Sequence, residues 1–432
     1  MIPLVTITAV NRLSGCILVP GDKSISHRGV IFGSIAKGTT RLKNFLMGED
    51  CISTIRAFRE MGVSIEVLEN DTIIIQGKGL RGLTAPSRNI DAGNSGTTAR
   101  LLMGLLSGQN FQSTLVGDES LQKRPMNRVA IPLKKMGASI KWLEEEGTLP
   151  LTIQGGNLKG IEYSMPVASA QVKSALILAT MYAENPSKIH QPAPSRDHTE
   201  IMLKAFGGQI DSNPTTITAY PVQELYAQDI YIPGDMSSAA YFITAGLIVP
   251  NSIITIKNVG LNPTRTGILD VYRDMGAHIS IENYRASGGE PLGDITVKTS
   301  SLKGITIEGE LIPRLIDEIP IIALAATQAT GTTIIRNAEE LKVKESNRIN
   351  SIVNTLKTMG ADIEATEDGM IINGPTALLG QDIYPGTDHR IVMMGAIAAL
   401  IAEGKTNIHG AKWADISYPG FFAVLKRLRE NP

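Results

Sequence analysis

One pattern recurs six times along the chain: a turn containing Gly or Asp runs into an apolar, alanine-rich segment that is long enough for a helix. The six segments begin at Pro20, Asp91, Met165, Pro233, Arg314 and Thr387. Their spacing of about 70 residues exceeds that of solenoid repeats and therefore indicates repeated subdomains. Because a helix N-terminus presents unpaired N–H groups and the positive end of the helix dipole, six such ends gathered in one place would form an anion-binding site.

Two further signatures accompany these helices. Five segments, such as MGVSIEV at Met61, predict a left-handed glycine cap followed by a β-strand that alternates apolar and polar residues. Four segments, such as GTTRLKN at Gly38, predict another strand directly after an alanine-rich helix. The repeating unit is thus strand, helix, strand, helix, strand. Since one such unit cannot bury both faces of its helices, several must pack around shared helices, which predicts an α/β fold.

The segments LVPGDKSISHR and YIPGDMSSAAY resemble each other closely, which indicates a half-chain duplication near Pro233. We expect one domain of three repeats over residues 21–233. The other domain, also of three repeats, would contain residues 234–432 together with residues 1–20, whose strands return to it. Two chain crossings, near Pro20 and Pro233, would then act as a hinge.

Charge and cysteine content limit the function classes. The 432-residue chain has a net charge of −1 and no basic run, which argues against nucleic-acid and membrane partners and makes any anion site local. Only Cys16 and Cys51 occur, and neither lies in a metal-ligand spacing, so neither a disulfide framework nor a metal site is expected. The opening MIPLVTITAV lacks the pattern of a signal peptide or an organelle import sequence, and we therefore expect a cytoplasmic protein.

The first helix start, GDKSISHR, carries Lys23 and Arg28 around its first turns. The fourth copy has Met236 and Tyr241 in their places, so the fold alone does not require the basic pair. A cradle for phosphate and carboxylate groups is the functional interpretation, and a capped helix with solvated charges is the alternative. His27 suits helix packing or the surface as well as it suits catalysis.

Other segments of the first half offer groups for anions or hydroxyls. GNSGTTAR, from Gly93, is a turn whose backbone N–H groups can approach an anion closely, but it lacks the GK[ST] of a Walker loop and also suits a plain capped turn. Further candidate side chains, in loops or near helix starts, are Lys123, Arg124, Ser169, Gln171, Ser195, Arg196 and His198. Each of these also suits an ordinary charged loop or a helix cap.

The second half adds acidic and basic groups. Asp317 and Glu318 stand beside an apolar helix, where one acid facing a basic cleft would serve as a general base; one cap and one exposed charge are the alternative. VKESNR offers Lys344, Glu345 and Arg348, and helical spacing places its Lys and Arg on one face. The basic candidates from both halves are Lys23, Arg28, Arg124, Lys344, Arg348 and Arg390. A cleft lined by them suits two anionic small molecules.

The motifs GDKSISHR, GNSGTTAR, KRPM, SAQVKSA, SRDHTE, LIDEIP, VKESNR, DHR and SYPGFF follow one another across nearly the whole chain. In this order they make the chain resemble the EPSP synthases of the enolpyruvyl transferase family. The resemblance implies a two-domain inside-out α/β barrel, in which each domain has three βαβαββ repeats with helices inside and sheets outside. It also implies transfer of the enolpyruvyl group from phosphoenolpyruvate to the 5-hydroxyl of shikimate 3-phosphate, with release of phosphate. This step of the shikimate pathway, toward chorismate and aromatic amino acids, uses no metal or organic cofactor.

Motif matching assigns site residues as the resemblance implies them. Those for shikimate 3-phosphate are Lys23, Ser24, Arg28, Ser169, Gln171, Ser195, Asp317 and Lys344. Those for phosphoenolpyruvate are Lys23, Gly96, Arg124, Gln171, Arg348 and Arg390. Asp317 is implied as the base for the 5-hydroxyl, while Glu345 with Lys23 would protonate the enolpyruvyl carbon and reverse that step. A tetrahedral adduct then loses phosphate.

The chain departs from the family pattern at three places. Ala170 stands where many members have a second Ser, His198 where some have Tyr, and Ile416 where some have a Lys that contacts phosphoenolpyruvate. These departures affect affinity more than the reaction. Gly96 is retained, which implies sensitivity to glyphosate.

The sequence argues against three rival functions. The sister enzyme that transfers enolpyruvyl to UDP-N-acetylglucosamine carries a reactive Cys in the loop that matches Lys123–Met126, and this chain has none there. A non-catalytic binding protein would lack Lys23, Asp317 or Glu345, and all three are present. An RNA-end-processing enzyme can use related repeats, but this sequence has neither a basic surface stripe nor a nucleotide motif to support that function. We expect a monomer whose partners are small-molecule substrates, with neither nucleic acid nor membrane.

Overall fold

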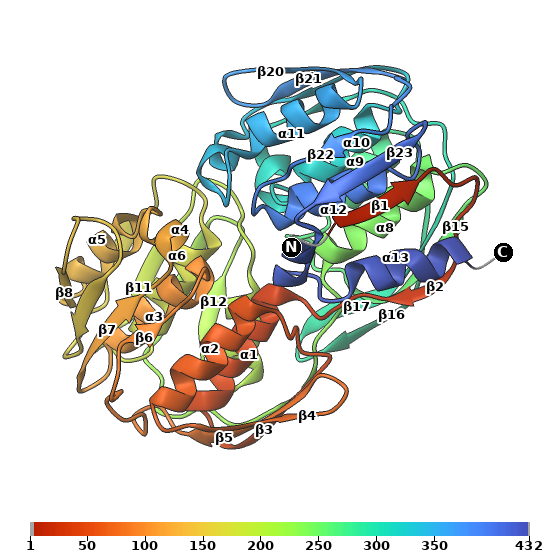
Figure 1. Ribbon diagram of the computed structural model, residues 1–432. Helices are drawn as coiled ribbons and strands as arrows, with labels where there is room; N and C mark the ends of the chain where they lie inside the picture. The colour runs from red at the N-terminus through yellow and green to blue at the C-terminus, as the bar shows by residue number, and fades with distance from the viewer. Residues whose placement is uncertain (1–3, 431–432) are drawn as a thin grey trace. The chain divides into compact units, whose positions relative to one another are not determined.

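The computed structural model describes residues 4–430, and contacts divide the chain into two compact units (Figure 1). Unit 2 contains Gly21–Ile232 together with the short segment Ala286–Glu290. Unit 1 contains the residues up to Pro20, Pro233–Arg285, and the chain from Pro291 onward.

Within residues 4–430, the strands of unit 2 form three four-stranded sheets. In spatial order, the first contains β14 (Asp229–Tyr231), β3 (Lys37–Lys43), β5 (Thr72–Lys78) and β4 (Ser64–Leu68). The second contains β6 (Ile90–Asp91), β7 (Gln112–Val116), β9 (Leu151–Gln154) and β8 (Ser139–Trp142). The third contains β10 (Glu162–Ser164), β11 (Ser187–His190), β13 (Thr216–Ala219) and β12 (Ile210–Ser212). In each sheet the first two strands are parallel and the other pairs are antiparallel, so one topology occurs three times.

Unit 1 repeats this topology with strands from both ends of the chain. One sheet contains β2 (Ser14–Leu18), β15 (Ile253–Gly260), β17 (Glu290–Lys298) and β16 (His278–Ser287). A second contains β18 (Thr306–Ile307), β19 (Gly331–Ile335), β21 (Met370–Gly374) and β20 (Asp362–Ala365). The third, of three strands, contains β22 (Asp382–Ile383), β23 (Lys405–His409) and β1 (Leu4–Thr8). The N-terminal strands thus complete sheets of unit 1: β2 runs parallel to β15, and β1 runs antiparallel to β23.

The six recurring segments of the sequence form six buried helices. They are α1 (Lys23–Ile35), α3 (Gly96–Ser107) and α6 (Ala170–Thr180) in unit 2, and α8 (Met236–Ile248), α10 (Ile319–Ala326) and α12 (His389–Ala398) in unit 1. The remaining helices are α2 (Glu49–Glu60), α4 (Glu119–Gln122), α5 (Asn127–Lys135), α7 (His198–Ala205), α9 (Gly267–Asp274), α11 (Arg348–Thr358) and α13 (Phe421–Glu430), with 3-10 helices η1 (Gly309–Arg314), η2 (Glu339–Val343) and η3 (Ala411–Ile416).

Helices occupy the inside of each unit, as the resemblance implies. Every residue of α10 is buried, and a helix that is apolar all round belongs in a core rather than at a surface. In unit 2, α3 and α6 pack so closely that a Cβ on Gly104 would lie 2.1 Å from the carbonyl oxygen of Ala175. Only glycine permits that approach. The predicted inside-out α/β fold with three repeats per domain is therefore confirmed.

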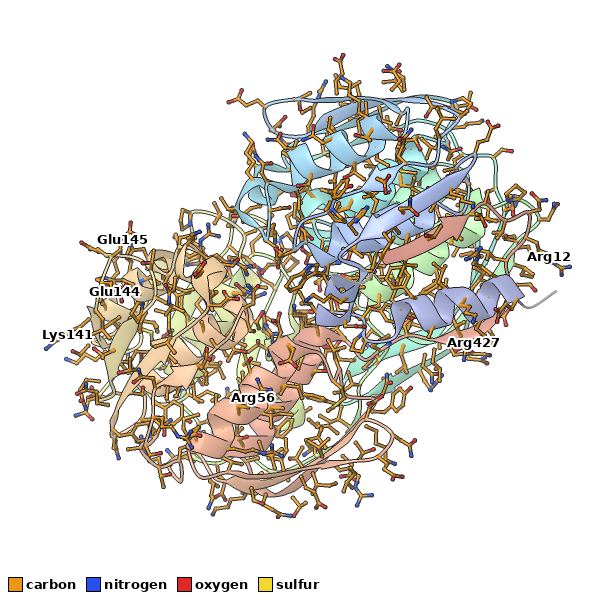
Figure 2. The ribbon with its side chains drawn as sticks, viewed as in Figure 1. Arg12, Arg56, Lys141, Glu144, Glu145 and Arg427 are labelled. Carbon is orange, nitrogen blue, oxygen red and sulfur yellow. The ribbon has the colours of Figure 1, made fainter. Side chains whose placement is uncertain are left out.

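The local signals at the helix ends are also confirmed. Gly62 and Gly137 each follow a helix and have φ of +84° and +100°. This is the left-handed conformation that segments such as MGVSIEV predict. At helix starts, Asp22 accepts a hydrogen bond from the Ile25 N–H, and Ser95 accepts one from the Thr98 N–H. Charged side chains such as Lys141 extend away from the ribbon into solvent (Figure 2). Among residues 4–430, no helix is both long and apolar enough to cross a membrane.

Candidate active site

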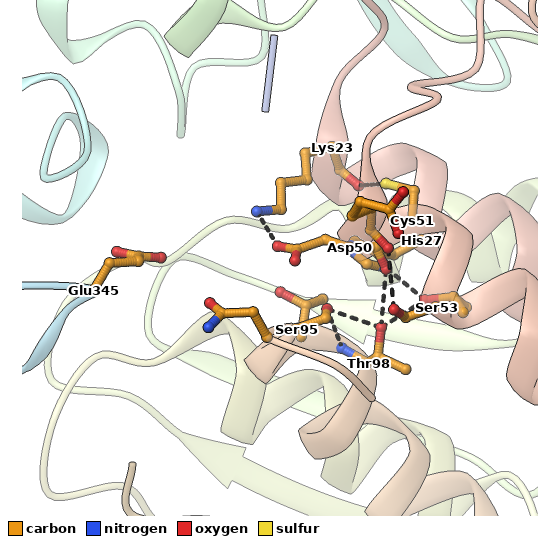
Figure 3. Close-up of polar contacts among 12 residues, drawn as sticks. Lys23, His27, Asp50, Cys51, Ser53, Ser95, Thr98 and Glu345 are labelled. Atoms are coloured by element: carbon orange, nitrogen blue, oxygen red, sulfur yellow. Dashed lines mark hydrogen bonds and ion pairs between the residues drawn. The ribbon is translucent and has the colours of Figure 1, made fainter. Parts of the chain in front are cut away.

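In unit 2, the start of α1 places two of the predicted basic residues. Lys23 is the first residue of α1, and its ammonium forms an ion pair with Asp50 of α2 (Figure 3). The Cys51 thiol lies 3.8 Å from the Lys23 carbonyl oxygen. Asp50 was not predicted from the sequence, because the contact depends on the packing of α1 against α2.

Arg28 is a buried cation whose hydrogen bonds all go to neutral oxygens. Arg28 is only 3% exposed. Its guanidinium donates to the Ser24 carbonyl (2.9 Å), Thr199 Oγ1 (2.6 Å) and Ser174 Oγ (2.7 Å). Burial lowers the pKa of Arg28 to about 10, against the opposing charge of Glu200, so the group stays charged at neutral pH. Within residues 4–430 no ion pair joins Arg28 to a carboxylate. A buried guanidinium in this state attracts an anion.

His27 is buried and neutral. Its Nδ1 lies 2.7 Å from Thr54 Oγ1, and burial lowers its pKa to about 3 despite the nearby Asp50. Thr54 and Thr98 share a hydrogen bond of 2.7 Å, and Thr98 donates to Ser95 Oγ (2.8 Å), so a chain of side chains joins α1 to the start of α3 (Figure 3). The structure supports the helix-packing interpretation of His27.

The starts of α3 and α6 are linked through Arg100. Gly96 is the buried first residue of α3, and Arg100 follows it by one helical turn. Arg100 Nη1 donates to Gln171 Oε1 (2.7 Å), and Gln171 Nε2 donates to Thr97 Oγ1 (3.0 Å). Two predicted residues, Gly96 and Gln171, are thus brought together by Arg100, which was not singled out. Its position within GNSGTTAR was the available signal.

Arg124 lies just after α4 and beside the same turn. Its Nη2 donates to Asn94 Oδ1 (3.0 Å), and the Asn94 amide donates to Asp118 Oδ2 (2.8 Å). Because Asn94 precedes Gly96 by two residues, the Arg124 guanidinium is held next to the turn that opens α3.

Ser169, Ser195 and His198 occupy the other helix starts of unit 2. Ser169 caps α6 and accepts from the Val172 N–H (3.4 Å), while the Ser195 hydroxyl donates to Gln191 Oε1 (2.7 Å). His198 Nδ1 lies 2.7 Å from a carboxylate oxygen of Glu290, with both side chains buried. Burial opposes protonation of His198, but the Glu290 charge outweighs it and raises the pKa.

In unit 1, the predicted residues of the second half form one charged cluster. Asp317 lies in the turn before α10, and its carboxylate is 3.2 Å from Arg348 Nη1, 3.6 Å from Lys344 Nζ and 3.9 Å from Arg390 Nη2. Arg348 Nη2 also lies 2.5 Å from Glu345 Oε2. The five residues that motif matching assigned in this half are therefore brought together, whereas Glu318, the other candidate acid, is buried and accepts a hydrogen bond from the Ser237 hydroxyl.

Asp388, which was not predicted, holds Arg348 of this cluster by an ion pair. Arg348 is 1% exposed, and its Nε lies 3.0 Å from Asp388 Oδ2. Burial acts against the charged form of Arg348, yet Asp388 and Glu345 raise its pKa. Burial likewise acts against the charged form of Asp388, yet Arg348 lowers its pKa. The available signal was the DHR motif, which contains Asp388.

One prediction about this segment was wrong. Lys344 and Arg348 do not share a helix face, because η2 ends at Val343 and α11 begins at Arg348. Asn347 caps α11 by accepting from the Asn350 N–H (3.3 Å), which starts the helix after Lys344. The two cations meet at Asp317 through the loop instead.

The chain is similar to known proteins over almost its whole length. The EPSP synthase (3-phosphoshikimate 1-carboxyvinyltransferase) family matches residues 7–425. A 3-phosphoshikimate 1-carboxyvinyltransferase from Thermoanaerobacter sp. (strain X514) is 56% identical over 96% of this chain and 98% of that protein. One from Bacillus pumilus (strain SAFR-032) is 56% identical over 97% and 98%.

The chain belongs to the EPSP synthase family. A solved EPSP synthase structure from Acinetobacter baumannii is 44% identical, covers 98% of each chain and superposes with a TM-score of 0.90. The enolpyruvyl transferase NikO from Streptomyces tendae, at 17% identity and a TM-score of 0.80, shares the fold over 99% of this chain and 97% of its own. Among the residues that the structure describes, no group of three or more His, Cys, Asp or Glu side chains is arranged to hold a metal ion in this EPSP synthase family member.

Proposed function

We propose that the chain is a 3-phosphoshikimate 1-carboxyvinyltransferase of the shikimate pathway, which leads to chorismate and the aromatic amino acids. It transfers the enolpyruvyl group of phosphoenolpyruvate to the 5-hydroxyl of shikimate 3-phosphate and releases phosphate. Relatives that carry this name are 56% identical to it over nearly their full length. The structural observation that supports the proposal most is the Asp317 carboxylate, which is held among three cations and next to the Arg348–Glu345 pair.

Two basic residues of unit 2 support the proposed binding of phosphate groups. Arg28 offers a buried positive charge that forms no ion pair with a carboxylate within the described residues, and Lys23 is the first residue of α1, where the helix dipole favours anions. We assign shikimate 3-phosphate to Lys23, Ser24, Arg28, Ser169, Gln171, Ser195, Asp317 and Lys344. We assign phosphoenolpyruvate to Lys23, Gly96, Arg124, Gln171, Arg348 and Arg390.

The proposed chemistry depends on carboxylates that lie among Lys and Arg cations. Asp317 accepts the proton of the 5-hydroxyl as the hydroxyl oxygen bonds to C2 of phosphoenolpyruvate. Glu345 with Lys23 delivers a proton to C3. The resulting tetrahedral adduct then breaks its C2–O bond to phosphate while C3 returns its proton, which restores the double bond. Cationic side chains offset the charge of the substrates and of the leaving phosphate, and their fixed positions replace a chance encounter of two anions.

The finer parts of the proposal concern partners and inhibition. The protein acts in the cytoplasm as a monomer, takes only small-molecule substrates and needs no cofactor. Glyphosate inhibits it, because Gly96 leaves the start of α3 without a side chain. A glyphosate inhibition constant far above the KM for phosphoenolpyruvate would contradict that last point.

Phosphate release from phosphoenolpyruvate tests the proposal. The second substrate is either shikimate 3-phosphate or UDP-N-acetylglucosamine, and Asp317→Ala protein purified in parallel controls for contaminating activity. Release only with shikimate 3-phosphate supports the proposal. Release only with the nucleotide sugar would overturn the substrate, and release with neither would overturn the enzymatic function.

A further inference from the structure

Lys173 is a lysine whose ammonium group is buried. It belongs to α6 in unit 2, and its side chain is only 1% exposed. Its Nζ lies 2.7 Å from Oε1 of Glu200 in α7 and donates to the Ser195 carbonyl (3.1 Å). One ammonium group therefore joins three segments: α6, the loop that carries Ser195, and α7. None of the roles proposed above involves Lys173.

The next residue along α6 repeats this connection. Ser174 Oγ and Thr199 Oγ1 are 2.6 Å apart, and Arg28 donates to both oxygens. Lys173 and Arg28 thus link the same two helices side by side. Since Arg28 and Ser195 are both assigned to shikimate 3-phosphate, any shift of α7 or of the Ser195 loop would disturb two contacts to that substrate.

Stability alone does not explain a charged pair at this place. Desolvation of two buried charges commonly cancels their attraction, and an apolar pair of similar size is often as stable. Oε2 of Glu200 is also buried and has no hydrogen-bond partner among the described residues, which adds to the cost. An apolar side chain in place of Lys173 could fill the space, but it could not donate to the Ser195 carbonyl.

We propose that Lys173 is a positioning residue for shikimate 3-phosphate. By holding the Ser195 carbonyl and Glu200 together, it fixes the Ser195 loop and α7 in the arrangement that binds this substrate. It therefore sets the affinity for shikimate 3-phosphate and not that for phosphoenolpyruvate, whose assigned contacts in this unit lie on other residues of α1, α3, α6 and the loop after α4. The inference rests on the proposed function.

The experiment compares three variants with the wild type. Lys173→Met removes the ammonium and leaves Glu200 unpaired, whereas the double variant Lys173→Met/Glu200→Leu removes both charges. Lys188→Met is the matched control, because Lys188 is half exposed on β11 of the same unit and lies 3.8 Å from Glu162. Each protein is measured for kcat, for KM of either substrate at saturation of the other, for direct binding of shikimate 3-phosphate, and for melting temperature.

We expect the single variant to lose thermal stability and the double variant to regain most of it. In both, KM and the dissociation constant for shikimate 3-phosphate rise about tenfold, the effect of one lost charge-assisted hydrogen bond, while KM for phosphoenolpyruvate changes less than about twofold. Lys188→Met keeps all wild-type values. A purely structural role predicts that substrate affinity recovers together with stability in the double variant, and that result would overturn the inference. An equal rise of both KM values would also overturn it. Absence of any turnover of shikimate 3-phosphate by the wild type would overturn the proposed function itself.

Discussion

Arg348 and Asp388 form an ion pair that is withdrawn from solvent, with Nε and Oδ2 3.0 Å apart and side chains 1% and 0% exposed. The same guanidinium reaches Asp317 and Glu345 with its other nitrogens. Asp388 therefore fixes the orientation of a group that the proposed mechanism places on phosphoenolpyruvate.

Replacing Asp388 with Asn should weaken both stability and binding. The Asn side chain can still cap α12, but it leaves Arg348 with a buried charge that has lost a partner, at a cost of about 3 kcal/mol. We expect a lower melting temperature and a higher KM for phosphoenolpyruvate than in Asp382→Asn, a control in an exposed pair with His409.

The same substitution tests the dependence of stability on pH. Since the folded-state pKa of Asp388 lies below its ordinary value of 3.8, the contribution of Asp388 to folding stability is present above that pH and is lost as the pH falls further. An acid-unfolding curve unchanged by the substitution would contradict this account.

Asp317→Asn should separate catalysis from binding. The amide keeps the size of the carboxylate but cannot accept the proton of the 5-hydroxyl, so kcat should fall by about 10²- to 10⁴-fold. Direct titration with shikimate 3-phosphate should show a much smaller change in its dissociation constant. Near-normal turnover in the Asn variant would remove Asp317 from the role of base.

His27 and His198 should affect the pH dependence of stability in opposite directions. The pKa of His27 is about 3 in the folded protein against 6.5 in the unfolded chain, so the unfolded state binds more protons below pH 6.5. Stability should therefore fall as the pH drops from 6.5 toward 3, by up to about 1.4 kcal/mol per pH unit, and His27→Gln should remove that loss.

The pKa of His198 is raised, so its contribution is present below pH 6.5 and is lost as the pH rises through the folded-state value. His198→Gln should remove this gain at low pH. Melting temperatures of the wild type and both variants across pH 5 to 8 test the two signs. Parallel curves for all three proteins would refute both assignments.

Gly96→Ala should act on Gln171 through Arg100. A Cβ at Gly96 would lie 2.9 Å from Arg100 Nη1, the atom that donates to Gln171 Oε1, so the guanidinium must move. We expect KM for phosphoenolpyruvate to rise several-fold with little loss of stability, because the displaced atom ends a flexible side chain. Gly156→Ala is the control, since a Cβ there meets nothing within 4 Å. Equal behaviour of the two variants would show that Arg100 does not transmit the change.

The fold was predictable from local signals, and the links within the site were not. Glycine caps such as Gly62 and the Asp and Ser caps act through their own backbone neighbours, so their chemistry is visible in a short segment. Asp50 and Lys173 gain their roles from helices far away in the sequence, and a lysine within an alanine-rich helix gives no sign of being buried. At Lys344 the error was local: helical spacing was assumed across Asn347, although Asn is a common N-cap and can mark the start of a new helix.

The strand pairing of unit 1 has a consequence for the order of events during synthesis. β1 is synthesised before the other described strands, yet its partner β23 ends at His409, about 400 residues later. β2 can pair only after its partner β15 has been made. In contrast, all the strands in the sheets of unit 2 lie within residues 37–231. The nascent chain can thus complete the sheets of unit 2 while β1 and β2 still have free edges, and the last sheet of unit 1 can close only after β23 has been made.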